Sequence, residues 1–468
     1  KVNKPLGQGA GFSLLSSKAT GIQFTNTLSR VRMMNANLLN GAGVASGDVD
    51  GDGLCDIYVC SLDGENGLFK NLGGWKFKDI SLEAGVGAPG MSSTGAVFGD
   101  LDGDGDLDLF VSSCGGPNAL FINDGKGKFS NQTKAAGLEA PKIGSTSVAM
   151  GDIDSDGDLD IYVTNYGETS VLRSGGKVTV RTVNGKKVVT GRYSNRIRIV
   201  KGNFVEVGEP DFLYLNDGSA KFEKVDWLDG NWLDEAGNPI KKEFWDLGLS
   251  VMIRDINQDG FPDIYNCNDF QTPDRLWVNK GNGKFQLVNE MAIRHRSYFA
   301  MAVDFADINR DGNDDFFVAD MMSPKHLLEM TQIGVTNPFA KPIDELIDRP
   351  IIHRNTLYVN RGDNTYMETA NYSGVSASEW TWGSTFMDVD LDGLEDLLIA
   401  NGHAFDTQDL DTIERTAKLG SLPVSQSRKK IFLFPPLAVP NMIYRNIGSL
   451  KFDEVGKDWG FNSKNVSH

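Results

Sequence analysis

Asp48-Val-Asp50-Gly-Asp52-Gly-Leu-Cys-Asp56 is an aspartate-rich loop whose design recurs six times in this 468-residue chain. In every copy a carboxylate or Asn stands at loop positions 1, 3, 5 and 9, and Gly stands at position 6. Oxygen ligands at alternate positions of a tight loop, with Gly where the backbone turns sharply, are what a hard cation such as Ca²⁺ requires. The loops therefore predict about six structural calcium sites.

We expect ligands from positions 1, 3, 5, 7 and 9 of each loop. The residues at position 7 share no chemistry, so a backbone carbonyl is expected to serve there. The expected ligands are Asp48, Asp50, Asp52, Leu54 and Asp56; Asp100, Asp102, Asp104, Asp106 and Asp108; Asp152, Asp154, Asp156, Asp158 and Asp160; Asp255, Asn257, Asp259, Phe261 and Asp263; Asp307, Asn309, Asp311, Asn313 and Asp315; and Asp388, Asp390, Asp392, Leu394 and Asp396.

The EF-hand, the best-known calcium loop, does not fit this pattern. An EF-hand needs a bidentate Glu at position 12 and a helix on each side. Position 12 is Val in four copies, Asn266 in the fourth and Ile399 in the sixth, and short apolar β-like runs such as Ile57-Tyr-Val follow the loops. The pattern favours a loop between two β-strands.

A second element follows each loop and has the form of a β-hairpin. Leu68-Phe-Lys-Asn71-Leu-Gly, with a second apolar anchor at Phe77, is the first of six copies. Alternating apolar residues around an Asn-x-Gly turn are typical of two antiparallel strands. Loops 1, 2 and 3 start 52 residues apart, as do loops 4 and 5. A repeat of about 50 residues with four strands predicts an all-β fold, a β-propeller of four-stranded blades, over a β-solenoid or an array of separate modules.

At this point the chain resembles a known family. Gly-Asp-Leu-Asp102-Gly-Asp-Gly-Asp-Leu-Asp-Leu-Phe-Val is similar to the FG-GAP/VCBS repeat of integrin-α-type propellers. Stretches from Asp307 to Asp320 and from Trp382 to His403 resemble the cartilage-acidic-protein (ASPIC-type) branch of that family. The resemblance implies seven blades, with a terminal strand closing the ring. Because such propellers serve adhesion, glycan binding and occasionally catalysis, it says little about activity.

We expect one propeller domain over residues 1–468. Its predicted repeats are 41–90, 91–143, 144–246, 247–298, 299–378 and 379–468, and residues 1–40 form a closing strand and entry segment. The run from Gly11 to Gly21 matches the last strand of a blade, from Lys76 to Gly85, whose other strands lie elsewhere. Whether the ring holds six or seven blades, and what completes it, stays open.

Composition narrows the functional class. The net charge of −17 comes largely from the 22 carboxylates of the loops, and six divalent ions would leave about −5. The chain has no basic stripe, which argues against nucleic acid, and no apolar run of about 18 residues that would span a membrane. Multi-site calcium binding favours an exported protein that is secreted, periplasmic or at the cell surface. The four cysteines show no zinc spacing and leave free thiols and one disulfide equally open.

Three connections between the second and third strands of a repeat are lengthened, at about 166–210, 321–353 and 401–440. All three must emerge on the face opposite the calcium loops, and insertions gathered on one face usually build a binding surface. Candidate ligand-binding residues there are Trp245, His326, His353, Trp380 and His403.

The expected function is non-catalytic binding of a protein or carbohydrate through that face. One alternative is a polysaccharide lyase or dehydratase on the same scaffold, with a His, Arg or Lys of the second or third insertion as the base. The other is a subunit of a larger extracellular or surface assembly, in which another subunit or a C-terminal fragment completes the propeller.

Overall fold

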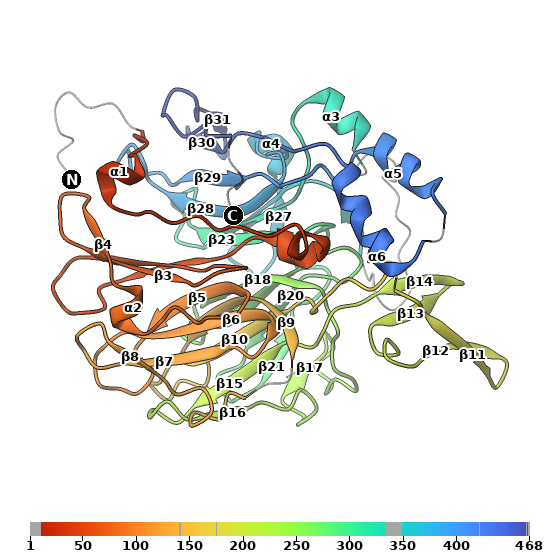
Figure 1. Ribbon diagram of the computed structural model, residues 1–468, viewed down its shortest axis with the longest axis horizontal. Coiled ribbons are helices and arrows are strands. Elements are labelled where there is room, and N and C mark those ends of the chain that lie inside the picture. Colours follow the sequence, from red (N-terminus) through yellow and green to blue (C-terminus); the bar gives the residue numbers. More distant parts are fainter. Residues whose placement is uncertain are drawn as a thin grey trace.

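The computed structural model of the chain describes residues 11–139, 142–174, 176–332, 349–420, 422–464 and 466. Residues 1–10 of the predicted entry segment and 333–348 of the second predicted insertion lie outside this part. Its strands form six four-stranded antiparallel units, which we call blades 1 to 6, with strands a to d in chain order from the inside outward (Figure 1). Pairing of β6 with β9 joins blades 2 and 3 into one larger sheet.

The blade strands have the following bounds. Blade 1 contains β1 (Val44–Gly47), β2 (Asp56–Val59), β3 (Gly67–Asn71) and β4 (Phe77–Asp79). Blade 2 contains β5 (Ser93–Gly99), β6 (Asp108–Gly116), β7 (Ala119–Asn123) and β8 (Phe129–Asn131). Blade 3 contains β9 (Ile143–Gly151), β10 (Asp160–Asn165), β15 (Phe212–Asn216) and β16 (Phe222–Lys224). Blade 4 contains β18 (Gly248–Arg254), β19 (Asp263–Asn268), β20 (Arg275–Asn279) and β21 (Phe285–Leu287), with β17 (Trp232–Leu233) parallel to β21. Blade 5 contains β23 (Ala302–Ala306), β24 (Asp315–Ala319), β26 (Thr356–Asn360) and β27 (Tyr366–Glu368). Blade 6 contains β28 (Thr381–Met387), β29 (Asp396–Asn401), β30 (Met442–Asn446) and β31 (Phe452–Glu454).

The remaining elements lie in connections between strands. The b–c connection of blade 3 carries β11 (Thr179–Val183), β12 (Lys186–Thr190), β13 (Ile197–Val200) and β14 (Asn203–Glu206). That of blade 5 carries α3 (His326–Thr331) and β25 (Ile351–Ile352), which pairs with β22 (Arg296–Ser297). That of blade 6 carries α5 (Leu410–Ala417), α6 (Val424–Ser427) and η4 (Arg428–Leu433). Short helical turns are α1 (Ser17–Thr20), η1 (Arg32–Met34), η2 (Ala36–Asn40), α2 (Ser81–Ala84) and α4 (Ala370–Ser373).

The lengthened connections share one side of the molecule. Figure 1 shows β11 to β14, α3, α5 and α6 in its right-hand half. Each follows strand b, whereas the aspartate loops precede strand b, so antiparallel pairing places the two sets at opposite strand ends. We call these two sides the insertion face and the loop face.

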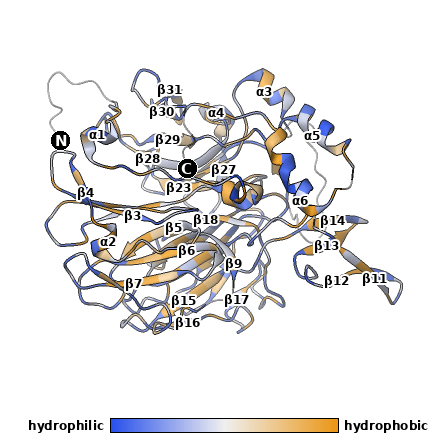
Figure 2. Cartoon of the chain, viewed as in Figure 1, coloured by the Kyte–Doolittle hydropathy of each residue, from blue (hydrophilic) through white to orange (hydrophobic). Residues whose placement is uncertain are grey.

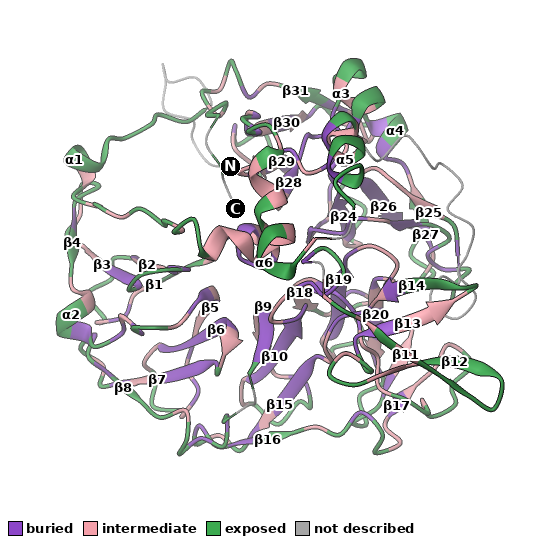
Figure 3. Ribbon diagram, turned by 45° about the vertical axis from the view of Figure 1, so that its right-hand side comes forward, coloured by how far each residue is buried: buried purple, intermediate pink, exposed green. Residues whose placement is uncertain are grey.

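The core lies between neighbouring blades, where side chains alternate along each strand. Tyr58 and Leu68 of blade 1 pack against Leu109, Val111 and Phe121 of blade 2. Full burial of such a side chain contributes about 1.5–3 kcal/mol. Figure 2 shows apolar segments along the blade strands, and Figure 3 shows buried strands arranged in a fan. This packing confirms the predicted all-β fold of four-stranded units.

The fan is open between blade 6 and blade 1. Inner strands pack side by side from β1 to β5, β9, β18, β23 and β28 in turn, but among the described residues β28 and β1 do not pack in this way. The first residue after the b-strand Asp is fully buried in blades 2 to 6, whereas its counterpart Ile57 in blade 1 is half-buried. The opposite wall of the space shows the same difference. The second residue after the b-strand Asp is 2% exposed or less in blades 1 to 5, as in Tyr58, whereas Leu398 at this position in blade 6 is half-buried. We call this space, bounded by Ile57, Val59, Leu398 and Ala400, the seventh-blade gap.

The N-terminal segment occupies the outer rim of this gap. Phe12 N donates to Trp459 O over 2.7 Å, just as Phe222 N of blade 3 donates to Ala136 O after blade 2. A Cβ on Gly460 would lie 2.4 Å from Phe12 O, and one on Gly21 would lie 2.4 Å from Phe77 O. Gly137 makes the equivalent close approach between blades 2 and 3, where an added Cβ would lie 2.8 Å from Phe222 O. Phe12 therefore stands where strand d of a seventh blade would stand, and no strand c lies beside it within the described residues.

Two further observations bear on the predictions from composition. No helix within the described ranges is long and apolar enough to cross a membrane. All four cysteines are free, with Cys60, Cys114 and Cys267 buried.

Candidate functional site

Each aspartate loop is held by hydrogen bonds from its own backbone. In loop 1 the Asp48 carboxylate accepts from Asp52 N (3.1 Å) and Gly53 N (2.7 Å), and Asp52 accepts from Leu54 N (2.9 Å). The bonds from position 6 to position 1 and from position 7 to position 5 recur in all six loops. Gly53 has a φ of 83°, and a Cβ there would meet no atom within 4 Å. Gly is thus required at position 6 for its backbone conformation rather than for space.

The Asp at position 9 ties the loop to the hairpin. Asp56 accepts from Val49 N (3.1 Å) and from Asn71 N (2.7 Å), and the bond from the hairpin Asn recurs in all six blades. Burial raises the pKa of Asp108 to about 6 and that of Asp160 to about 7. Neighbouring aspartates contribute to the rise of both pKa values. The folded chain therefore gathers negative charge that a cation would neutralise.

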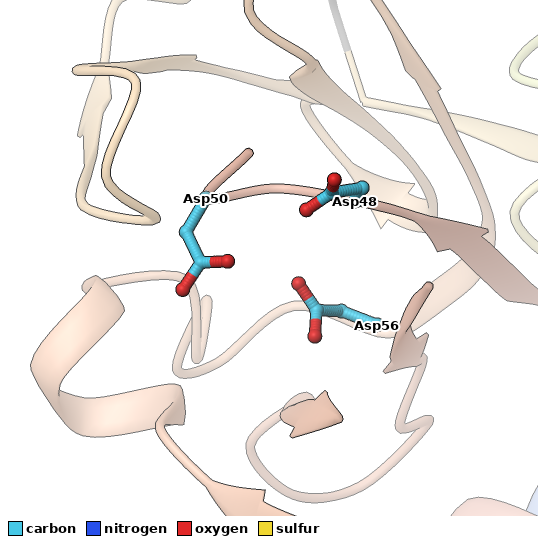
Figure 4. A group of neighbouring side chains, drawn as sticks. All are labelled: Asp48, Asp50 and Asp56. Carbon is cyan, nitrogen blue, oxygen red and sulfur yellow. The ribbon is translucent and has the colours of Figure 1, made fainter. Parts of the chain in front are cut away.

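The carboxylates at positions 1, 3 and 9 converge. In loops 1, 2, 3 and 6, ligand oxygens from these positions lie within 4.8 Å of one another. Figure 4 shows Asp48, Asp50 and Asp56 pointing toward a common point. Buried Oδ1 atoms of Asp50 and Asp102 have no hydrogen-bond partner. An all-oxygen cluster with unpartnered buried lone pairs fits a hard divalent cation such as Ca²⁺. Loops 4 and 5 have Asn257 and Asn309 at position 3, so an amide oxygen replaces one carboxylate.

In two of the loops a basic side chain contacts the carboxylates at positions 3 and 5. Lys70 Nζ contacts Asp50 and lies 2.8 Å from Asp52 Oδ2. Arg445 Nη2 lies 2.6 Å from Asp390 Oδ2 and 2.8 Å from Asp392 Oδ2. Lys70 and Arg445 each precede the hairpin Asn, where the other four blades have Ile122, Leu215, Val278 and Val359. Loops 1 and 6 thus differ electrostatically from loops 2 to 5.

A cavity of about 430 Å³ opens on the insertion face. Its wall combines residues of η1 and η2 with Arg173, Met321 and side chains of the b–c connection of blade 6 such as His403 and Arg428, so all three lengthened connections and the entry segment contribute. Leu249, Met301 and Trp382 line both this cavity and a second one of about 240 Å³ that reaches the inner strands of blades 1, 2 and 3. The larger cavity therefore lies over the centre of the fan.

An aromatic stack forms one wall of this cavity. The His403 ring lies parallel to Trp380, with centroids 4.4 Å apart and planes at 11°, and its centroid is 6.0 Å from Trp382. His403 Nδ1 contacts the backbone carbonyl of Phe405. Burial lowers the pKa of His403 to about 4, so its imidazole is neutral at pH 7. Trp380 and His403 are the predicted ligand-binding residues that the structure brings together.

The other three predicted ligand-binding residues lie apart from this stack. His353 lines an adjoining cavity of about 320 Å³, where it packs on Tyr298 at 4.4 Å, and burial lowers its pKa. His326 begins α3 with its side chain 87% exposed. Trp245 is half-buried and does not line the larger cavity. Within the described ranges, the side-chain clusters that could hold a metal ion consist of aspartates and contain no histidine.

Sequence reasoning missed Arg173 and the methionines Met33 and Met34 as cavity residues, and it placed Arg428 in the third insertion without assigning it to a ligand site. Met33 and Met34 belong to the entry segment, and nothing in its sequence predicts that it folds back over the fan. Arg428 belongs to the basic run Arg428-Lys-Lys430. The sequence shows that this run is basic, but it does not indicate that the run lies beside a cavity.

Known proteins resemble this chain over part of its length. A family model described as an FG-GAP-like repeat matches residues 48–111, 100–163 and 255–318. Cartilage acidic protein 1 of Mus musculus is 29% identical over 256 residues, which cover 52% of this chain and 38% of the mouse protein. The protein of that name in Homo sapiens is 30% identical over 132 residues, which cover 27% of this chain and 19% of the human protein. The chain thus matches well under half of the length of these relatives.

Solved structures resemble it more distantly. A lectin of Agrocybe aegerita that recognises terminal N-acetylglucosamine is 15% identical, with a TM-score of 0.32 over 91% of this chain and 98% of the lectin. A mutant of AofleA from Arthrobotrys oligospora is 13% identical, with a TM-score of 0.38 over 89% of this chain and 87% of AofleA. No function is inferred from likeness at that level. The aspartate loops, the hairpins that follow them and the sequence matches agree: the chain carries FG-GAP-like repeats within residues 48–163 and 255–318, and it is similar to cartilage acidic protein 1 over part of its length.

Proposed function

We propose that this protein is a calcium-stabilised β-propeller of an extracytoplasmic compartment that binds a protein or carbohydrate partner through its insertion face. About six Ca²⁺ ions on the loop face have a structural role, and the protein acts by binding rather than by catalysis. The cavity of about 430 Å³ at the centre of the insertion face carries the proposal, since all three lengthened connections meet there. Ligand sites in proteins are typically apolar hollows of roughly 300–1,000 Å³ with a few polar groups.

Segregation of charge supports this division of the molecule. The loop face holds the 22 carboxylates of the repeats, which calcium would neutralise. The insertion face carries basic residues, among them Arg173, Arg428 and Lys430 at the cavity. A partner is therefore expected on the basic, aromatic side.

A glycan array read with two tryptophan variants tests the proposal. Trp382→Ala removes an aromatic wall of the cavity, whereas Trp75→Ala removes a 71% exposed indole from the turn between β3 and β4 on the loop face. Binding lost in Trp382→Ala and kept in Trp75→Ala is the expected result. The opposite pattern would place the site on the loop face and refute the proposal.

The seventh-blade gap favours a second role, that of a subunit in a larger assembly. Its walls, Ile57 and Val59 on one side and Leu398 and Ala400 on the other, are apolar and half-buried. We propose that three strands from outside the described residues, with an aspartate loop of the same design, occupy the gap and make a seven-bladed ring with the Phe12 segment as the outer strand. Asn71 is placed to bond such a loop, because Asn123, Asn216 and Asn279 each donate to a loop carbonyl of the preceding blade.

Matched core variants test whether the gap is open in the isolated protein. Leu109→Ala removes a fully buried side chain and is expected to cost about 2–5 kcal/mol of unfolding free energy. Ile57→Ala, at the aligned position in blade 1, is expected to cost less than half as much. Equal costs in urea denaturation would mean that the gap is filled, and would remove the case for an external segment.

A further inference from the structure

Two basic side chains at the cavity on the insertion face, Arg428 and Lys430, lack acidic partners within the described residues. Arg428 makes no ion pair and no side-chain hydrogen bond within the described part of the chain, and its Nε is buried without a partner. Lys430 Nζ donates to the backbone carbonyl of Thr416 at 3.1 Å and makes no ion pair there either. Arg445, by comparison, is paired with two aspartates on the opposite face. An arginine left unpaired beside an apolar cavity is costly unless an anion joins it.

The acidic group in the cavity wall is already occupied. Among the described lining residues Asp269 alone is acidic. Its carboxylate accepts from Tyr166 Oη (2.7 Å) and Phe270 N (3.0 Å). Its charge also interacts with the buried guanidinium of Arg173, so Asp269 offsets Arg173 and leaves the charges of Arg428 and Lys430 in excess.

Two further buried hydrogen-bond donors in the cavity wall also lack a partner. Trp380 is 7% exposed and Gln408 is 5% exposed, and both line the cavity. Trp380 Nε1 and Gln408 Nε2 have no hydrogen-bond partner. Buried polar groups are nearly always paired in native proteins, and each unpaired one costs about 1–3 kcal/mol. Since the unpaired atoms, including Arg428 Nε, are all donors, the missing partner is rich in acceptor oxygens.

The size of the cavity and the other residues of its wall favour a ring-shaped ligand over a simple anion. A volume of about 430 Å³ exceeds what a sulfate or phosphate ion fills. Trp382 and Phe434 supply aromatic surface, and Asn40, Ser174 and Thr407 supply short polar groups. Aromatic faces interspersed with hydroxyl and amide groups suit a hydroxylated ring with an apolar face.

We propose that this cavity binds an anionic sugar ring, the acidic unit of a glycan, with Arg428 holding its carboxylate or sulfate group. Lys430 supplies further positive charge, and the Trp380–His403–Trp382 stack forms the wall beside the ring. The inference rests on the proposed function, because it names the ligand class of the same face. Arg428 is the residue expected to distinguish acidic from neutral sugars, since charge-assisted hydrogen bonds are about twice as strong as neutral ones.

Titration of the calcium-loaded protein with four probes tests the inference. The probes are D-glucuronate, D-glucose 6-sulfate, D-glucose and sodium sulfate, followed by tryptophan fluorescence and calorimetry. One of the two acidic sugars is expected to bind at least tenfold more tightly than glucose, and the one that does identifies the anionic group. Sulfate alone is expected to bind more weakly than that sugar.

Two neighbouring charge variants supply the control. Arg428→Gln should weaken acidic-sugar binding tenfold or more and leave glucose binding unchanged. Lys429→Gln removes the same charge from the next residue, which is exposed and outside the cavity wall, and should leave both unchanged. Equal melting temperatures of the two variants establish that both are folded.

The possible results separate this inference from the proposed function. Equal affinity for glucose and the acidic sugars, or unchanged binding in Arg428→Gln, overturns the role of charge. Sulfate binding as tightly as the sugars overturns the role of the ring. If all four probes fail while partner binding still depends on Trp382, the inference falls and the proposed function stands. If partner binding is also independent of Trp382, both fall.

Discussion

Lys70 and Arg445 are the residues that most distinguish one aspartate loop from another. Each places a tethered cation beside carboxylates at positions 3 and 5, where a metal ion would otherwise supply the charge. We therefore predict that Lys70→Ile raises the Ca²⁺ affinity of loop 1, since the ammonium no longer competes. Calcium titration by calorimetry should show one site becoming tighter by tenfold or more.

The converse substitution provides the control for this prediction. Ile122 occupies the aligned position in blade 2, and Ile122→Lys should weaken loop 2 as Lys70→Ile strengthens loop 1. Lys78→Ile, which removes a charge paired with Glu83 away from any loop, should change no site. Identical titrations of Lys70→Ile and the parent protein would contradict the idea of a tethered competitor.

His403 makes stability depend on pH in a defined direction. Burial lowers its pKa in the folded state to about 4, against about 6.5 in the unfolded chain. The unfolded state therefore binds more protons between these values, and stability is lost as pH falls from about 6.5 through 4, by about 3 kcal/mol at most. His403→Gln should flatten this part of the pH profile.

Urea denaturation at pH 7 and pH 4.5 measures this effect. His326→Gln is the matched control, because that side chain is 87% exposed and should leave the profile unchanged. A parent protein and a His403 variant that lose the same stability on acidification would show that the imidazole is not buried in solution.

At the scale of the element, the hairpin asparagines join one blade to the next. Asn123 Nδ2 donates to Val49 O of blade 1 at 2.8 Å as well as to Leu107 O of its own loop. Asn360 is equally buried, but the bond from its Nδ2 runs to Asp314 O of its own blade. Asn123→Ala should therefore cost about 1–3 kcal/mol more than Asn360→Ala, because it leaves a buried carbonyl unpaired across an interface.

Equilibrium denaturation of both variants in excess calcium measures this difference. If the two substitutions cost the same, the bond between the blades contributes nothing measurable.

Elements formed by local sequence were predictable, and the cavity was not. The pattern from Asp48 to Phe77 contains its own turn glycines, alternating apolar residues and hairpin Asn, so strands and loops follow from it directly. The cavity is lined by Met33, Arg173, His403 and Arg428, which come from three separate parts of the chain: the entry segment and the b–c connections of blades 3 and 6. Trp245 is an example, because the sequence around an aromatic residue near a blade is the same whether the side chain packs in the core or lines a ligand site. Residue type identifies such candidates, but only the three-dimensional path of the chain shows which of them line the cavity.

For the whole molecule, calcium should decide whether the fan is stable. The repeated aspartates stand close together on one face, and their mutual repulsion opposes folding until cations join them. Each site adds about 2.7 kcal/mol when calcium is present at 100 times its dissociation constant. Thermal melts in EDTA should therefore lie well below melts in millimolar Ca²⁺.

Magnesium at the same concentration serves as the control, because its octahedral preference suits these loops less well. Melts in EDTA and in calcium that coincide would contradict a structural role for the metal.

The bond between Phe12 and Trp459 has a consequence for how the protein acquires its structure. It joins residues near opposite ends of the described chain, so a ribosome must release nearly all of blade 6 before the Phe12 segment finds its place. Blades 2 to 5 need no such wait, since each packs on the blade made just before it. We therefore expect folding to proceed from blade to blade during synthesis and to end in one slow, non-local step, because contacts between distant parts of a chain form late.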